Sequence, residues 1–200
     1  MATRSTGSTS TTLFNVPNQL TALRLVLAIV LFGFIAFQSF IWSMVLFLIA
    51  AGTDWLDGYW ARKYGQVTVV GRIFDPFVDK VIICGAFIGL VAEPESGVKA
   101  WMATVVVGRE LLVTALRSFL EQRGSDFSAS MSGKWKMVFQ CTAVALSLFL
   151  LGKTEIGPAR DSLVWLRDGT IWLAVILTVY SGVGYVLTAA KLIRQPQTEP

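Results

Sequence analysis

Apolar residues are gathered into six long stretches, and short segments rich in charged residues, glycine and proline separate them. A helix needs ~20 mostly apolar residues to cross the hydrocarbon core of a bilayer, and these stretches have about that length. The pattern predicts an all-α integral membrane fold with six transmembrane helices. The predicted helices cover residues 20–37, 41–62, 75–92, 100–122, 133–151 and 170–192.

The two ends of the chain differ from this apolar body. Residues 1–12 are rich in serine and threonine, which favours a disordered N-terminal tail. A single membrane domain is predicted over residues 13–194, followed by a C-terminal tail over residues 195–200. A short interfacial helix or turn is predicted before the first membrane helix, with Asn18 or Thr21 as its capping residue. The last part of the chain, from residue 151, is expected to add only hydrophobicity.

Basic residues divide unevenly between the two sides of the predicted bundle. The side of the N-terminus carries Arg4, Arg62, Lys63, Arg72, Arg123, Lys134, Lys136, Lys191 and Arg194, and the other side carries Lys99, Lys153, Arg160 and Arg167. The positive-inside rule then predicts that both termini are cytoplasmic, and the expected location is the inner membrane of a bacterium. Basic and aromatic residues do not interleave as single-stranded nucleic-acid binding requires, so nucleic acid is not an expected partner.

Histidine is missing from the sequence, and the two cysteines are Cys84 and Cys141. Without histidine, Ser-His and Cys-His triads, imidazole zinc sites and histidine bases are excluded, which leaves carboxylates as the natural general base. Both cysteines lie inside apolar runs. They are expected to be small buried side chains and not a disulfide.

Four aspartates lie within or beside predicted membrane helices. A carboxylate at membrane depth costs at least ~2.5 kcal/mol, so four of them indicate a bound cation or a reaction. Residues three and four apart are neighbours on a helix, which predicts two stripes. The first consists of Asp54, Asp57, Gly58, Ala61 and Arg62, and the second of Gly71, Asp75 and Asp79.

A short connection makes these two helices antiparallel neighbours, so the two stripes can face each other. Converging carboxylates repel without cations, and hard oxygen ligands beside phosphate suit Mg²⁺ or Mn²⁺, as a pair of ions. Gly58 and Ala61 leave room for a phosphorylated ligand, and Arg62 offers donors to phosphate oxygens. The pattern predicts a metal-assisted phosphoryl-type transfer site. Helix capping or a surface salt bridge is the alternative, which suits a lone aspartate better than this set.

The spacing D-x2-D-G-x2-A-R-x8-G-x3-D-x3-D resembles the signature of the CDP-alcohol phosphatidyltransferase family, with every signature position filled. Members displace CMP from a CDP-linked lipid or alcohol with the hydroxyl of a second substrate. The resemblance implies six membrane helices, usually in a homodimer, with a cytoplasm-facing active site. It also implies that Asp54, Asp57 and Asp75 bind metal, and that Asp79 is the general base and a further metal ligand. The implied CDP-lipid pocket consists of Asn18, Thr21, Asp54, Gly58, Ala61, Arg62, Thr68 and Gly71.

Other segments are similar to those of phosphatidylglycerophosphate synthases. They are residues 15–24, residues 108–110, Thr114, Arg117, Gly124, residues 132–134, Lys136 and Gln140. This similarity implies CDP-diacylglycerol as donor and sn-glycerol 3-phosphate as acceptor, with phosphatidylglycerophosphate and CMP as products.

The charges favour the same acceptor. Arg109 and Arg117 fall about two turns apart on one helix face, and with Lys134 they form a cationic cluster suited to the acceptor phosphate. Supporting or structural roles are assigned to Glu110, Arg24 and Lys136. Serine, choline or ethanolamine would not need so many cations, whereas inositol phosphate would.

Several alternatives stay open at this point. Arg117, Lys134 and Lys136 are also explained as anchors that snorkel to lipid headgroups, and Arg109 with Glu110 as a structural buried pair. Cardiolipin or inositol-phosphate lipid synthesis is possible within the same family. A divalent-cation channel or transporter is the alternative outside it, although a cation path gains nothing from Arg62. Interfacial positions are expected for Trp42, Trp101, Trp165 and Trp172.

Overall fold

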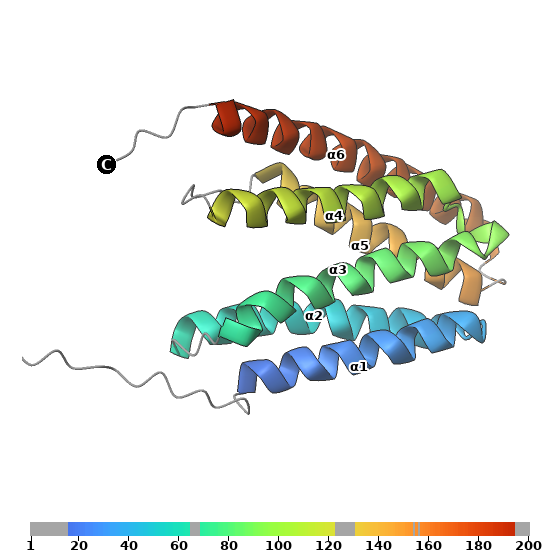
Figure 1. Cartoon of the computed structure of the whole chain (residues 1–200). Helices are drawn as coiled ribbons and strands as arrows, with labels where there is room; N and C mark the ends of the chain where they lie inside the picture. The colour runs from blue at the N-terminus through green and yellow to red at the C-terminus, as the bar shows by residue number, and fades with distance from the viewer. Residues whose placement is uncertain (1–15, 65–68, 123–130, 154, 156, 195–200) are drawn as a thin grey trace, which may run out of the picture.

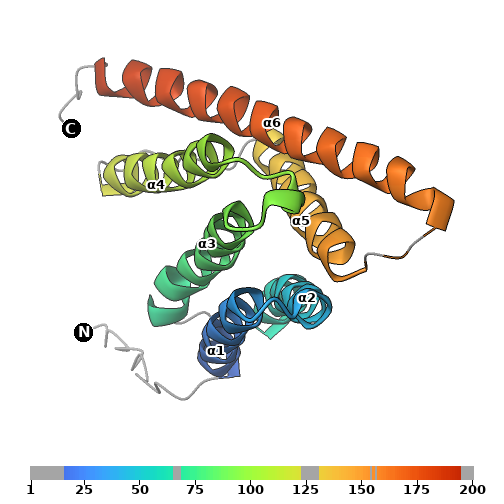
Figure 2. The same cartoon turned by 90° about the vertical axis from the view of Figure 1, so that its right-hand side faces the viewer.

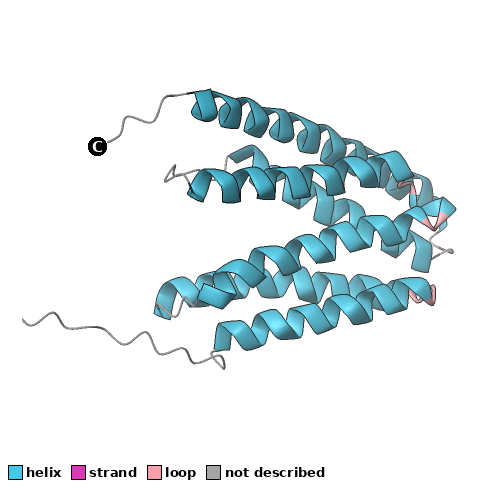
Figure 3. Ribbon diagram, viewed as in Figure 1, coloured by secondary structure: helices cyan, strands magenta, loops and turns pink. Residues whose placement is uncertain are grey.

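Six α-helices and two short 3-10 helices make up the part of the chain that the structure, a computed structural model, describes: residues 16–64, 69–122, 131–153, 155 and 157–194. Figure 3 shows helices throughout, joined by short loops. The elements are α1 (Val16–Ala36), α2 (Phe40–Tyr64), α3 (Val69–Val91), η1 (Pro94–Ser96), α4 (Ala100–Gln122), α5 (Met131–Gly152), η2 (Gly157–Ala159) and α6 (Arg160–Arg194). The predicted all-α class is confirmed. The predicted tails, residues 1–12 and 195–200, lie outside the described residues.

Three helices begin four or more residues earlier than the hydrophobic pattern predicts; the first, α1, begins at Val16 instead of residue 20. The third helix begins at Val69, before Gly71, and runs through Pro76. The sixth begins at Arg160, ten residues before the predicted Thr170, because its charged first turns find polar partners in the fold. Proline removes one helical hydrogen bond, and helices in a membrane bundle tolerate this.

The predicted N-terminal cap of the first helix is wrong. Helix α1 begins at Val16, so Asn18 and Thr21 lie inside the helix, and a capping residue would have to precede it. The predicted interfacial turn before the first helix is therefore the first turn of α1 itself from Val16 onward; residues 13–15 lie outside the described part.

Helix α3 is the central element of the bundle. Viewed along the bundle, it lies between the α1–α2 pair and the group formed by α4, α5 and α6 (Figure 2), and it contacts α1, α2, α4 and α5. Its inward side chains are buried and form the largest share of the hydrophobic core. They are Val78, Ile82, Ile83, Ala86, Phe87 and Leu90.

Small residues bring α1 close to α3. A Cβ atom added at Gly85 would lie 2.2 Å from the ring of Phe32, so no larger residue fits there unless that ring shifts. Small residues at helix interfaces permit close backbone approach and tight van der Waals packing, which drives association of membrane helices. This α1–α3 contact therefore helps to fix the position of the second half of α3.

Large apolar side chains cover much of the outer surface, among them Trp165, Tyr180 and Leu187 on α6. Two helical segments of the described chain are long and apolar enough to cross a membrane, Trp135–Gly152 and Gly157–Leu192. Two further apolar segments, Thr21–Ala36 and Phe40–Thr53, are shorter. An extensive exposed apolar surface is unusual in a soluble monomer. These features are those of a membrane protein.

The bundle has two unlike ends (Figure 1). At one, called here the aspartate end, α2 ends, α3 begins, and the described chain both starts and finishes. At the other, the loop end, η1 and η2 connect the helices. Arg167 holds the loop end together: its Nη1 donates to the carbonyl of Glu95 (2.6 Å), and its Nε donates to Asp168 Oδ1 (2.9 Å). Gly97 closes this loop at φ 77°, a conformation that favours glycine.

Candidate active site

The four signature aspartates lie on two helices that contact each other, α2 and α3. Asp54 and Asp57 lie in the last turns of α2, and Asp75 and Asp79 in the first half of α3. Gly58, Ala61 and Arg62 follow on α2, and Gly71 precedes on α3, whereas Thr68 lies outside the described residues. The helical register that the stripes require is therefore present on both helices.

That the carboxylates of α2 and α3 face each other remains a prediction. Among the side chains that the structure describes, three acidic, cysteine or histidine groups do not meet in one place. Asp54, Asp57 and Asp75, on which the metal prediction depends, are not among those side chains. The donor set itself fits the predicted ion, because carboxylate oxygens are the ligands that Mg²⁺ and Mn²⁺ prefer.

Asp79 forms an ion pair with Arg24 of α1. The guanidinium Nη1 donates to Asp79 Oδ1 at 2.8 Å, the Arg24 side chain is 1% exposed, and that of Asp79 is 24% exposed. A buried arginine with a rigid, planar guanidinium holds a carboxylate in one orientation. Arg24 thus holds Asp79 from the buried side, while part of the Asp79 carboxylate remains accessible.

A second polar cluster lies between α4, α5 and α6. Glu110 of α4 forms ion pairs with Arg109 Nη1 (3.4 Å) and with Lys136 Nζ of α5. The side chains of Glu110 and Lys136 are both buried. Lys136 does not reach the surface, so the headgroup-anchor alternative is wrong for this residue. The pairing of Arg109 with Glu110 agrees with the expectation that intramembrane ions find each other.

Helix α6 contributes polar groups to this cluster. Arg109 Nη2 donates to Ser181 Oγ (3.1 Å), and Arg117 Nη2 donates to Tyr185 Oη (3.4 Å). The Arg109 guanidinium also lies over the Tyr185 ring, 5.3 Å from its centroid. One turn earlier, Thr178 Oγ1 accepts from Gln140 Nε2 of α5 (3.1 Å). The expectation that the last part of the chain adds only hydrophobicity is therefore wrong.

The helical register of α4 is as predicted. Arg109 and Arg117 both contact Tyr185, so they lie on one face of α4. Lys134, the third predicted acceptor residue, lies in the first turns of α5, and its side chain is outside the described set. Sequence reasoning missed Ser181 and Tyr185, because a lone serine and tyrosine in an apolar helix give no spacing signal.

Lys80 of α3 links the two clusters electrostatically. It follows Asp79 in the chain, and the charges of Asp79, Glu110, Arg117 and Arg109 all act on its ammonium group. The charges of both clusters therefore influence the same ammonium group. Sequence reasoning gave Lys80 no role.

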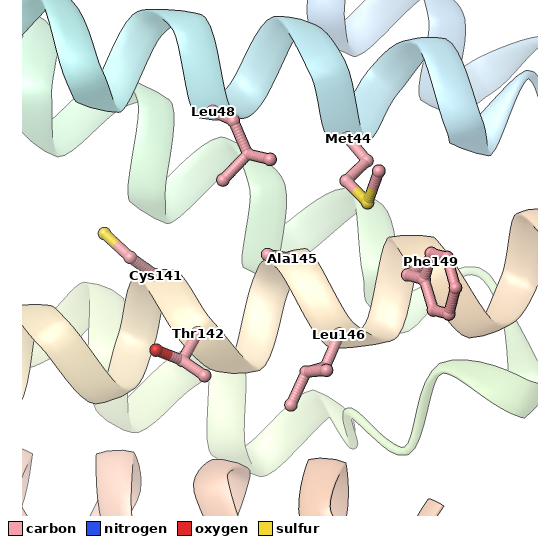
Figure 4. Close-up of a pocket in the computed structure, with 7 residues that line it drawn as sticks. All are labelled: Met44, Leu48, Cys141, Thr142, Ala145, Leu146 and Phe149. Carbon is pink, nitrogen blue, oxygen red and sulfur yellow. The ribbon is translucent and has the colours of Figure 1, made fainter. Parts of the chain in front are cut away.

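Other predicted features lie away from these clusters. The four tryptophans expected at the membrane interface are all exposed: Trp42, Trp101, Trp165 and Trp172. Both cysteines are free thiols, as predicted, but they are only partly buried, so the expectation of fully buried side chains is wrong. An apolar groove of about 330 Å³ lies between α2 and α5 (Figure 4). Its single hydroxyl group, on Thr142, donates to the carbonyl of Val138 (2.9 Å). The groove contains none of the predicted site residues.

Known proteins resemble the chain over most of its length. The sequence pattern of the CDP-alcohol phosphatidyltransferases matches residues 14–180. A Bacillus subtilis (strain 168) protein named CDP-diacylglycerol--glycerol-3-phosphate 3-phosphatidyltransferase is 36% identical over 189 residues, which covers 86% of this chain and 94% of the relative. A Haemophilus influenzae protein of the same name is 34% identical over 185 residues, covering 88% and 94%. One from Salmonella paratyphi A is 33% identical over 187 residues, covering 89% and 96%.

The aspartate register on α2 and α3, the ion pair at Asp79 and these similarities all concern the same part of the chain. Together they establish that the chain belongs to the CDP-alcohol phosphatidyltransferase family.

Proposed function

We propose that this protein transfers the phosphatidyl group of CDP-diacylglycerol to the 1-hydroxyl of sn-glycerol 3-phosphate, giving phosphatidylglycerophosphate and CMP. The observation that carries this choice is the surplus of positive charge between α4, α5 and α6. Among the described side chains there, one carboxylate, Glu110, pairs with Arg109 and Lys136, and a third cation, Arg117, donates to the Tyr185 hydroxyl instead. The relatives that bear this activity in their names support the same acceptor.

The charge surplus selects a phosphorylated acceptor over a neutral or zwitterionic one. Buried charges are costly unless they are paired, so a cluster with more cations than anions is stabilised by an anionic ligand. The phosphate of glycerol 3-phosphate carries up to two negative charges and accepts hydrogen bonds from guanidinium groups in a fork. Serine, choline or ethanolamine would leave the surplus charge uncompensated.

The divalent ions belong to the donor side of the proposed site. Asp54, Asp57, Asp75 and Asp79 would hold Mg²⁺ or Mn²⁺, because hard cations prefer a site made of oxygen ligands. When bound, such ions neutralise the diphosphate of the donor and stabilise CMP as leaving group. Arg62 would donate to phosphate oxygens, and Gly58 and Ala61 would leave space for the nucleotide.

The chain's own groups supply the proton transfer. Asp79 takes the proton of the acceptor 1-hydroxyl, the resulting oxygen attacks the β-phosphorus, and the bond from that phosphorus to the CMP oxygen breaks. Arg24 keeps the Asp79 carboxylate oriented during this step, at 2.8 Å. No histidine exists to activate a serine or cysteine nucleophile, so we expect direct transfer without a covalent intermediate.

The topology of the protein in the membrane is part of the proposal. All six helices would span the bilayer, with the aspartate end and both termini on the cytoplasmic side of a bacterial inner membrane. CDP-diacylglycerol would enter sideways from the lipid, and glycerol 3-phosphate would enter from the cytoplasm. A homodimer is expected from the family resemblance.

CMP release from detergent-solubilised protein tests the proposal. The protein is incubated with CDP-diacylglycerol and Mg²⁺, and with glycerol 3-phosphate, inositol 1-phosphate, serine or phosphatidylglycerol in parallel. We expect release with glycerol 3-phosphate alone and no release in EDTA. Release with another acceptor would overturn the acceptor assignment, and release in EDTA would overturn the metal assignment.

A further inference from the structure

Three residues of α6 form a seat for the side chain of Arg109, called here the arginine seat: Ser181, Gly182 and Tyr185. Each contacts a different part of the arginine. Ser181 Oγ accepts from Nη2 at 3.1 Å, and the Tyr185 ring lies 5.3 Å from Cζ. A Cβ atom added at Gly182 would stand 3.1 Å from Arg109 Cγ, so the missing side chain makes room for the arginine stem.

The seat is buried, and its hydroxyl groups accept hydrogen bonds from the two arginines of α4. Ser181 is 3% exposed and Tyr185 is 5% exposed. Ser181 donates its proton to the carbonyl of Thr178 (3.2 Å), which leaves its oxygen lone pairs for the arginine. Tyr185 contacts both predicted acceptor residues of α4, because its hydroxyl accepts from Arg117 Nη2 at 3.4 Å.

The seat holds the guanidinium groups without neutralising them. Its hydroxyl and aromatic groups carry no net charge, so the seat adds no second anion to Glu110, the carboxylate that pairs with Arg109. The Nε atoms of both arginines are buried and have no hydrogen-bond partner in the part of the chain that the structure describes. Buried donors without partners are costly, and a phosphate oxygen is the acceptor that suits a guanidinium best.

We propose that the arginine seat positions Arg109 and Arg117 for the phosphate of the acceptor and thereby sets the affinity for phosphorylated acceptors. This inference rests on the proposed function and adds the residues of α6 to it. The seat begins at residue 181, whereas the family pattern matches residues 14–180. The seat therefore adds residues that lie just beyond this matched range.

Two glycines on α6 give a matched test. Gly182→Ala places a methyl group against the stem of Arg109, whereas Gly184→Ala meets nothing within 4 Å. Both changes favour the helix equally. We expect Gly182→Ala to raise the KM for glycerol 3-phosphate by about 10-fold or more, since a small displacement of a binding group is costly. The KM for CDP-diacylglycerol should stay within about twofold of wild type, and Gly184→Ala should match wild type in both.

Two tyrosines of α6 give a second, independent test of the seat, one as the variant and one as its control. Tyr185→Phe keeps the ring beneath Arg109 and removes the hydroxyl that Arg117 contacts, whereas Tyr180 is 71% exposed on the outer face of the same helix. We expect Tyr185→Phe to raise the acceptor KM by about 3- to 10-fold, the usual range for one hydrogen bond. Tyr180→Phe should leave it unchanged, and Tyr185→Leu should exceed Tyr185→Phe because it also removes the ring.

The outcomes separate this inference from the proposed function. Unchanged acceptor KM values in Gly182→Ala and Tyr185→Phe would overturn the seat, as would an equal rise in the KM for CDP-diacylglycerol, which indicates a general structural role. If wild-type protein used inositol 1-phosphate in place of glycerol 3-phosphate, the proposed acceptor would be wrong. The same comparison of KM values with inositol 1-phosphate would then decide the seat.

Discussion

Two arginine–aspartate pairs at opposite ends of the bundle have the same distance and different surroundings. Arg24 and Asp79 lie 2.8 Å apart at the aspartate end, and Arg167 and Asp168 lie 2.8 Å apart at the loop end. Both arginines are buried. Arg24 and Asp79 connect α1 to α3 across 55 residues of sequence, whereas Arg167 and Asp168 are neighbours in α6.

The two ion pairs differ in the charged and polar groups that surround them. Arg167 Nη1 donates to the carbonyl of Glu95, so this arginine connects a loop to a helix. Asp168 balances its positive charge. Asp79 belongs to a row of signature carboxylates and adjoins Lys80, on which the charges of the α4 cluster act. The length of an ion pair therefore says little about function. The balance of charges around the pair distinguishes a structural contact from a binding or catalytic one.

The largest effect expected from this comparison is on turnover. Asp79→Asn removes the proposed base, and kcat should fall by about 10²- to 10⁴-fold. Binding of CDP-diacylglycerol should persist, because the other three aspartates remain. Asp168→Asn is the control at the loop end and should keep kcat within about twofold of wild type. Wild-type turnover in Asp79→Asn would refute the base assignment.

The next effect is on stability, at the carboxylate that two cations share. Glu110→Ala leaves Lys136 and Arg109 buried without their partner, and removing one member of a buried ion pair costs about 3–5 kcal/mol. The melting temperature in detergent should fall strongly. Glycerol 3-phosphate or inorganic phosphate should restore part of the loss by binding the cations that have lost their carboxylate partner. An unchanged melting temperature would show that the pairing contributes nothing to stability.

Two arginine variants separate an effect on acceptor binding from an effect on stability. Arg117→Ala should raise the KM for glycerol 3-phosphate by about 10- to 100-fold, the range for a hydrogen bond to a charged group, with a small change in melting temperature. Arg167→Ala should do the reverse, because it removes the contacts to Glu95 and Asp168 and leaves the acceptor site intact. If Arg117→Ala left the acceptor KM unchanged, this arginine would be an anchor of the membrane helix.

The smallest effect is expected at the outer rim of the loop end. Arg160 Nη2 lies 3.2 Å from Glu95 Oε2, and the Glu95 side chain is 73% exposed. Exposed ion pairs contribute about 0–1 kcal/mol. Glu95→Ala should therefore shift the melting temperature by no more than a few degrees and leave both KM values unchanged, because the backbone carbonyl that Arg167 uses remains. A large loss of stability would show that the loop end depends on this pair.

The sequence predicted the helices and the register of the signature residues, because both follow from short-range periodicity. The steps between Asp54 and Asp57, and between Asp75 and Asp79, depend only on helix geometry. Contacts between residues far apart in the sequence could not be predicted in this way. Nothing in the pattern indicates that Arg24 meets Asp79 or that Lys136 turns inward to Glu110, since these contacts depend on how α1 and α5 pack.

Helix α6 illustrates why the remainder could not be predicted. Its first turns were excluded from the sixth helix on account of their charges, which in the fold are satisfied by Glu95 and Asp168. Its polar residues Ser181 and Tyr185 stand in an apolar run where burial is the ordinary expectation. Their role depends on the two arginines of α4 that they meet, and sequence spacing within α6 contains no information about them.

Pro76 has a mechanical consequence for the aspartate end. It lies in α3 between Asp75 and Asp79, and because proline has no N–H, the helical hydrogen bond from residue 76 back to the carbonyl of residue 72 is missing. The bending stiffness of α3 is therefore lowest in the turn over residues 72–76, which contains Asp75 and precedes Asp79. From Val78 onward the helix is clamped in the core, while the preceding segment is the compliant part. A small flexure at one residue is enough to alter the spacing of the two carboxylates, and the rest of the bundle need not move.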